Sequence, residues 1–143
     1  MTGSSRENTE VSPMALDLPF SPESASVARH RLVEWMSSLG AADEHRDDAQ
    51  LVVSELVGNA VRHARPLADG TMHVTWTTID SSIDSGVDIA VTDGGALTTP
   101  ERVEAGVSDL AGRGLSIVET LAARWWVEST RSRTTVHAQL ALS

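Results

Sequence analysis

Three polar side chains recur at intervals of four residues within an otherwise apolar segment, LVVSELVGNAVRHA, residues 51–64. They are Glu55, Asn59 and His63. At about 100° per residue, a helix places them in one stripe beside its apolar face. Mg²⁺ takes oxygen ligands and shares them with substrate phosphates, and a carboxylate can accept a proton from a hydroxyl nucleophile. The stripe suits a metal–phosphate site, although an amphipathic helix with solvated polar residues is the simpler interpretation of this segment alone.

An aspartate ends the apolar segment VDIAVTDGG, residues 87–95. Asp93 would lie at the end of an inner strand and at the floor of a pocket, while Gly94 and Gly95 keep the adjacent backbone open to a flat ligand. Its carboxylate could accept a hydrogen bond from an exocyclic amine such as that of adenine. Taken alone, an ordinary Asp-Gly turn after a strand is the simpler interpretation.

Two glycines flank an arginine in the segment AGRGLSIVETL, residues 111–121. Gly112 and Gly114 expose backbone N–H groups at a helix start, where the helix dipole favours an anion. Arg113 would add positive charge to a phosphate site. A loop whose glycines merely allow a bend remains the alternative.

The elements that must position these residues follow from periodicity and capping. Residues 1–15 are expected to be a disordered tail, and residues 16–143 one domain. Two helices, a hairpin, a third helix and a second hairpin predict an α+β fold, a two-layer sandwich with a mixed, mostly antiparallel sheet and helices packed on one face. The predicted helices run from Ser21 to Gly40, from Asp43 or Glu44 to Ala64, and on from Gly114; the predicted strands are 72–79, 87–92, 125–130 and 134–142, with turns at 80–86 and 131–133.

Composition narrows the chemistry. The 143 residues include no cysteine, tyrosine or lysine, which excludes disulfides, thiolate sites, a P-loop lysine and a Schiff base. The formal net charge of -9 argues against direct nucleic-acid binding. No apolar run approaches the roughly 20 residues that span a bilayer, and the N-terminus lacks a secretory h-region. We therefore expect a cytoplasmic protein.

The order of the three segments along the chain resembles the N box, G1 box and G2 box of the GHKL (Bergerat-fold) ATPases. The segments DDAQLVVSELVGNAVRHA and GRGLSIVETLAARW look like those of the single-domain anti-sigma-factor serine kinases typical of actinobacteria. The resemblance covers residues 20–142. It implies the Bergerat ATP-binding fold with ATP and Mg²⁺ as cofactors.

The same resemblance implies a role for each matching residue. Asn59 would coordinate Mg²⁺, and Glu55 would act as the catalytic base or position it. Asp93 would recognise the adenine amino group, with Gly95 lining the base pocket, while the Gly112–Gly114 segment would lie at the lid and phosphates. His63 is expected to form hydrogen bonds at the pocket rim, because no further ligand cluster points to a metal-binding role.

The sequence departs from the family pattern in three places. A Gly-Lys/Gly-x-Thr element of the last hairpin is replaced by Arg133-Thr134-Thr135, so the glycine is absent and Thr135 (or Thr134) is expected to keep the contact on the adenine side. Trp125-Trp126 stands where glycine is frequent, and is expected to pack on the sheet. The lid, residues 96–111, is short, which would hold nucleotide weakly.

By resemblance, the protein would transfer the ATP γ-phosphoryl group to a serine of an anti-anti-sigma (STAS-domain) partner. It would bind that partner and a sigma factor in alternation, and form a homodimer. A non-catalytic module that sequesters a partner remains open: Glu55 and Asn59 favour the enzyme, whereas the absent glycine and short lid favour the module. A detached sensor-histidine-kinase catalytic domain is the weaker third interpretation, because no phosphoacceptor helix precedes residue 20.

Overall fold

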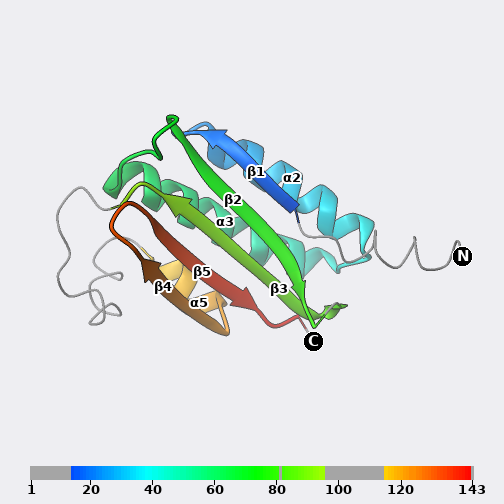
Figure 1. The fold of residues 1–143 in the computed structure, drawn as a ribbon. Coiled ribbons are helices and arrows are strands. Elements are labelled where there is room, and N and C mark those ends of the chain that lie inside the picture. The colour runs from blue at the N-terminus through cyan, green and yellow to red at the C-terminus, as the bar shows by residue number, and fades with distance from the viewer. Residues whose placement is uncertain (1–13, 81, 96–114, 143) are drawn as a thin grey trace, which may run out of the picture.

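The fold has two layers, a five-stranded sheet and three helices that lie on one of its faces (Figure 1). The computed structural model describes residues 14–80, 82–95 and 115–142, and these counts refer to those residues. The architecture is the predicted α+β sandwich. The strands are β1 (Met14–Pro19), β2 (Thr71–Ile79), β3 (Ser82–Asp93), β4 (Arg124–Ser129) and β5 (Thr134–Leu140); the helices are α2 (Ser24–Ser38), α3 (Asp43–His63) and α5 (Ser116–Leu121).

The strands are arranged in the order β1-β2-β3-β5-β4, and each described pairing is antiparallel. Because side chains alternate along a strand, Val87, Ile89 and Val91 of β3 point toward the helices and are buried. Residues 88, 90 and 92 of the same strand point the other way. We call these two sides the helix-covered face and the open face; the open face carries no helix in the described part of the chain.

Helix α3 provides most of the contact between the two layers. It begins at Asp43, as predicted, and ends at His63, after which Ala64 is extended and Pro66 prevents continuation. Each large apolar side chain that it buries contributes about 1.5–3 kcal/mol. Its buried apolar residues are Ala49, Val52, Val53, Leu56, Val57 and Ala60.

The other helices complete the core on the same face. Trp76 of β2 is the largest fully buried side chain, and its ring centroid lies 6.4 Å from that of Trp35 in α2. Leu115 and Val118, at the start of and within α5, are fully buried. None of the helices in the described ranges is long and apolar enough to cross a membrane.

Strand β1 was not predicted from the sequence. Its first two residues, Met14 and Ala15, were assigned to the tail, and the rest of the predicted tail lies outside the described residues. Leu16 and Leu18 alternate with exposed positions over only six residues, too short a pattern to distinguish from a coil. Pairing with β2 over six residue pairs decides the conformation.

Two further boundaries differ from the prediction. The predicted turn at residues 80–86 is tighter, because β3 already begins at Ser82 and Asp80 takes a left-handed conformation, with φ of 54°. Helix α2 begins at Ser24, later than predicted. The Ser24 N–H donates to the Ser21 carbonyl at 3.1 Å, so residues 21–24 form a turn that precedes the helix.

Candidate functional site

The predicted polar stripe lies on α3, at the margin of its buried face. Asn59 is buried, with 2% of its surface exposed, while Glu55 and His63 are partly exposed. His63 occupies the last helical turn, and Ala64 caps the helix. The stripe therefore consists of one buried amide between two partly accessible side chains.

The Asn59 amide oxygen stands out among the polar atoms of this stripe. Within the described part of the chain, Asn59 Oδ1 is buried and has no hydrogen-bond partner. A buried polar atom without a partner destabilises a fold by about 1–3 kcal/mol, so its presence requires an explanation. An amide oxygen is a suitable ligand for Mg²⁺, so Asn59 fits the metal-binding role expected from the sequence.

Carboxylates and imidazoles do not form a complete metal site around it. Among residues 14–80, 82–95 and 115–142, no three His, Asp or Glu side chains gather in a way that could hold a metal ion. A cation at Asn59 would therefore take its remaining ligands from water and nucleotide phosphates, as Mg²⁺ commonly does.

Asp93 lies at the end of β3 and is 3% exposed. Strand alternation places it on the helix-covered face, together with Val91 and Ile89. Its Oδ1 accepts a hydrogen bond of 2.8 Å from the Gly95 N–H, which orients the carboxylate. A buried, oriented carboxylate at the end of a strand can recognise an amine of a flat ligand.

Two backbone hydrogen bonds join the end of α3 to the end of β3. The Gly94 N–H donates to the Arg65 carbonyl at 2.7 Å, and the Arg65 N–H donates to the Gly95 carbonyl at 3.0 Å. A Cβ atom at Gly94 would lie 2.1 Å from the Pro66 carbonyl oxygen, so only glycine allows this approach. The junction brings the stripe of α3 and Asp93 to the same edge of the helix-covered face.

The sequence pattern did not predict this junction, because it assigned the two glycines to ligand access or to an ordinary Asp-Gly turn. The sequence features that point to the junction are Pro66, shortly after the end of the helix, and the adjacent pair Gly94-Gly95. Gly95 has φ of +104°, a backbone conformation that glycine adopts most easily. The glycines are thus required by the fold itself, and an open base pocket remains a prediction.

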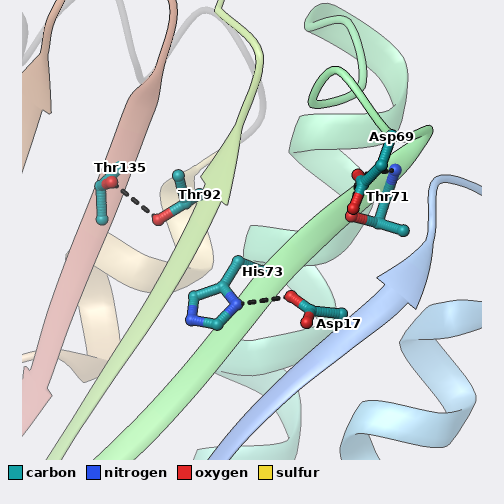
Figure 2. Close-up of polar contacts among 6 residues, drawn as sticks. All are labelled: Asp17, Asp69, Thr71, His73, Thr92 and Thr135. Atoms are coloured by element: carbon teal, nitrogen blue, oxygen red, sulfur yellow. Dashed lines mark hydrogen bonds and ion pairs between the residues drawn. The ribbon is translucent and has the colours of Figure 1, made fainter.

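Of the two threonines expected to keep the contact on the adenine side, Thr134 lies on the helix-covered face and Thr135 on the open face. The Thr135 hydroxyl forms a 2.7 Å hydrogen bond with Thr92 on the open face, as Figure 2 shows. Thr134 is the cross-strand partner of Asp93 and shares its face. The alternation of Val136, Ala138 and Leu140 toward the core was the sequence signal for this choice.

The paired tryptophans pack on the sheet, as predicted. Trp125 is partly buried against the hydrophobic core. Trp126, on the open face, stacks on His137 with ring centroids 4.6 Å apart, and the Arg124 guanidinium lies 4.8 Å from the Trp126 ring. These contacts stabilise the pairing of β4 with β5 and do not involve the predicted nucleotide pocket.

The predicted phosphate-binding segment cannot be placed in the same way. Gly112, Arg113 and Gly114, with the lid at residues 96–111, lie outside the described residues. The described chain resumes at Leu115, which is fully buried, and enters α5 at Ser116. The role of these three residues stays a prediction from the sequence.

Solved structures that are similar to this one include the following two. The RsbU and RsbW domains of Rv1364c from Mycobacterium tuberculosis match with a TM-score of 0.69 and 22% sequence identity, covering 91% of this chain and 32% of that chain. The SiaB-SiaC complex from Pseudomonas aeruginosa matches with a TM-score of 0.61 and 10% identity, covering 98% of both chains. At these identities the likeness concerns the fold, and this chain spans about a third of the length of the first.

Sequence comparison assigns the family more directly. No curated protein matches the chain. The profile of the histidine kinase-like ATPase domain, however, matches residues 18–140, which include the whole stripe of α3, Asp93 and the Gly112–Gly114 segment. The chain belongs to the histidine kinase-like ATPase domain family.

Proposed function

We propose that this protein binds ATP with Mg²⁺ at the edge of the helix-covered face and phosphorylates a serine of an anti-anti-sigma (STAS-domain) partner. The buried Asn59 Oδ1 without a described hydrogen-bond partner carries this proposal. The backbone junction with the end of β3 supports it, because it brings Asp93 to the same edge. Membership of an ATPase-domain family makes a nucleotide the natural ligand.

The proposed roles follow from the position and chemistry of each side chain. Asn59 would hold Mg²⁺, which when bound neutralises charge on the phosphates. Glu55 is partly exposed and can accept the proton of the attacking serine hydroxyl. Asp93 would accept from the adenine amine, and Gly95 would line the base pocket. His63 would form a hydrogen bond at the rim.

Phosphate contacts would come from the segment before α5. Gly112 and Gly114 supply backbone N–H groups and Arg113 supplies a guanidinium, groups that stabilise charge in phosphoryl transfer. Thr134 replaces Thr135 in the proposed pocket, because it shares a face with Asp93. Positioning and charge stabilisation are most of what a protein must supply for this reaction.

The partners are proposed from similarity. RsbW and SiaB domains share this fold, and SiaB is found in a complex with SiaC. By analogy we propose that this chain alternates between a STAS-domain protein and a sigma factor in the cytoplasm, as a homodimer. Its net charge of -9 suits protein partners with basic surfaces.

Labelled phosphate transfer tests the proposed reaction. The protein is incubated with γ-labelled ATP, Mg²⁺ and each STAS-domain protein of the same genome. Wild type should label one of them, and Glu55→Gln should lower the rate by about 100-fold, the usual contribution of a positioned base. Glu34→Gln, at an exposed carboxylate of α2, is the matched control and should retain the rate. Absence of labelling with every partner contradicts the kinase.

Nucleotide binding is tested separately by calorimetry. Asp93→Asn should abolish or greatly weaken the binding of adenine nucleotides. GTP should bind poorly to wild type and to the variant. Asp84→Asn, at an exposed site of the same strand, should bind as wild type does. If wild type binds ATP and the partner but transfers nothing, the protein is the non-catalytic module that the short lid and the absent hairpin glycine favour.

A further inference from the structure

A cavity of about 370 Å³ opens on the other side of the sheet from the proposed nucleotide site. Three segments meet there: the paired strands β1 and β2, the loop that follows α3, and the turn between β4 and β5. Figure 2 shows four of its residues on the strands and the loop. The cavity, which we call the open-face cavity, is lined chiefly by Asp17, Leu67, Asp69, Thr71, His73 and Arg133.

The Asp69 carboxylate is held in place by its neighbour. The backbone N–H and the hydroxyl of Thr71 both donate to Asp69 Oδ1, at 3.2 and 2.6 Å. The hydroxyl bond above all lowers the pKa of Asp69, so this carboxyl group is ionised at neutral pH. Because both bonds end on Oδ1, the Oδ2 atom keeps its capacity to accept from a ligand.

A second oriented carboxylate lies on the neighbouring strand. Asp17 Oδ1 is 2.7 Å from His73 Nδ1, a cross-strand pair on the open face (Figure 2). The pair directs the Asp17 side chain toward the same cavity. Two carboxylates therefore line one cavity, and each has one oxygen outside these hydrogen bonds.

Arg133 supplies the opposite charge. It lies on the β4–β5 turn and lines the cavity together with the two carboxylates. Its charge is the smallest of the influences that lower the pKa of Asp69. A guanidinium presents a planar set of donors that matches a carboxylate.

Two carboxylates and one guanidinium complement a ligand that carries two cations and one carboxylate. We propose that the open-face cavity binds a free basic amino acid, such as arginine, lysine or ornithine. Its two cationic groups would pair with Asp17 and Asp69, and its carboxylate would pair with Arg133. The cavity is open to solvent, with Asp17, Asp69 and Arg133 exposed on its walls, and its volume of about 370 Å³ is at the small end of ligand sites.

Two segments connect the cavity to the proposed nucleotide site, the loop that follows α3 and the turn between β4 and β5. The Leu67 N–H donates to the Thr71 carbonyl at 2.8 Å and the Gly70 N–H to the Leu67 carbonyl at 2.8 Å, which makes the loop compact. The same loop begins at Arg65, bonded to Gly94 and Gly95. On the other wall, Arg133 directly precedes Thr134, the partner of Asp93.

Both the loop that begins at Arg65 and the segment Arg133-Thr134 contribute residues to the cavity wall and continue to the end of β3. A ligand in the cavity is therefore expected to affect the surroundings of Asp93. As an extension that rests on the proposed function, the bound amino acid alters the affinity for adenine nucleotide. Such coupling between two sites is reciprocal, and its usual range is about 5- to 150-fold.

Calorimetry of the full chain with arginine, lysine and ornithine, without nucleotide, tests the site itself. Arginine should bind wild type, and Arg133→Gln should weaken binding by about tenfold or more, equivalent to about 1.4 kcal/mol. Arg131→Gln, on the same turn but outside the cavity, should change it by less than about twofold. For the carboxylate, Asp69→Asn is the corresponding test variant and should weaken arginine binding. Asp84→Asn, outside the cavity, is its control.

Agmatine, which is arginine without its carboxylate, separates the two halves of the site. It should bind Arg133→Gln at least as tightly as it binds wild type, and glutamate should bind neither. Thermal unfolding checks that each variant is folded. Failure of all three basic amino acids to bind at millimolar concentration, or equal weakening by Arg131→Gln and Arg133→Gln, overturns the proposed site.

ADP affinity with and without saturating arginine tests the coupling. A change of about fivefold or more supports it. Arginine binding that leaves the ADP affinity the same overturns the coupling and retains the site. Arginine binding by a wild-type protein that binds no nucleotide overturns the proposed function and leaves the site standing.

Discussion

Arg65 and Gly94 are joined by a backbone hydrogen bond of 2.7 Å, and Arg65 also donates to the Gly95 carbonyl at 3.0 Å. These bonds connect the chain just after α3 with the chain just after β3. The polar stripe of α3 and the carboxylate of Asp93 are therefore held by one junction. Any change there is expected to affect both walls of the proposed nucleotide site at once.

The two glycines of this junction should differ in their tolerance of a side chain. Gly94→Ala would place a Cβ 2.1 Å from the Pro66 carbonyl oxygen, and we expect it to destabilise the fold by about 3 kcal/mol. Gly95→Ala meets no atom within 4 Å and bears only the strain of its φ of +104°, about 1–2 kcal/mol. Urea unfolding measures both. Equal losses for the two variants would contradict the geometry of the junction.

Asn59 should show opposite effects on stability and on binding. Asn59→Leu removes a buried oxygen without a described partner, so without nucleotide it should leave the free energy of unfolding unchanged or raise it by about 1 kcal/mol. Wild type should unfold at a higher temperature with Mg²⁺ and ADP, and the variant should not. Thermal melts with and without ligand measure both effects. A loss of about 2 kcal/mol in the unliganded variant would mean that the oxygen is already hydrogen-bonded.

Thr134 and Thr135 form a matched pair, because adjacent residues of β5 face opposite sides of the sheet. Thr134→Val should weaken ADP binding by about tenfold, equivalent to one hydrogen bond in the pocket. Thr135→Val should leave ADP binding unchanged and cost about 1 kcal/mol of stability, because it strands the buried Thr92 hydroxyl. The reverse result in calorimetry would assign the contact on the adenine side to Thr135 rather than Thr134.

Asp88 should make stability depend on pH. It lies on the open face with Oδ1 3.7 Å from His137 Nδ1, and burial raises its pKa more than the His137 charge lowers it. Above the raised pKa the folded state bears a poorly solvated charge; below the ordinary pKa of aspartate both states are protonated and this penalty disappears. Asp88→Asn should therefore raise the free energy of unfolding at neutral pH.

Urea titrations at several pH values check this expectation. The advantage of Asp88→Asn should shrink as the pH falls from the raised pKa toward the ordinary one. Asp84→Asn, at an exposed carboxylate of the same strand, should show no such trend. A variant that is less stable than wild type at neutral pH would show that the pair with His137 outweighs the effect of burial.

The amino-acid sequence by itself determined the layer architecture and most element positions. Period-two alternation in β2 and the core half of β3 and the apolar stripe of α3 are local patterns, and the structure confirms the predicted strands and the start of the helix at Asp43. The order of the three polar segments identified the family, which the profile match confirms. Periodicity and motif order depend on residues that are close along the chain, so they can be recognised without a structure.

Pairing between distant segments decided the remaining features. Strand β1 exists because β2 pairs with it; the Arg65–Gly94 bond and the open-face cavity exist because loops far apart in sequence meet at one end of the sheet. The choice of Thr134 over Thr135 depends on which side of β5 meets the helices. Register and facing are properties of the assembled sheet, because a shift of one residue exchanges its two faces.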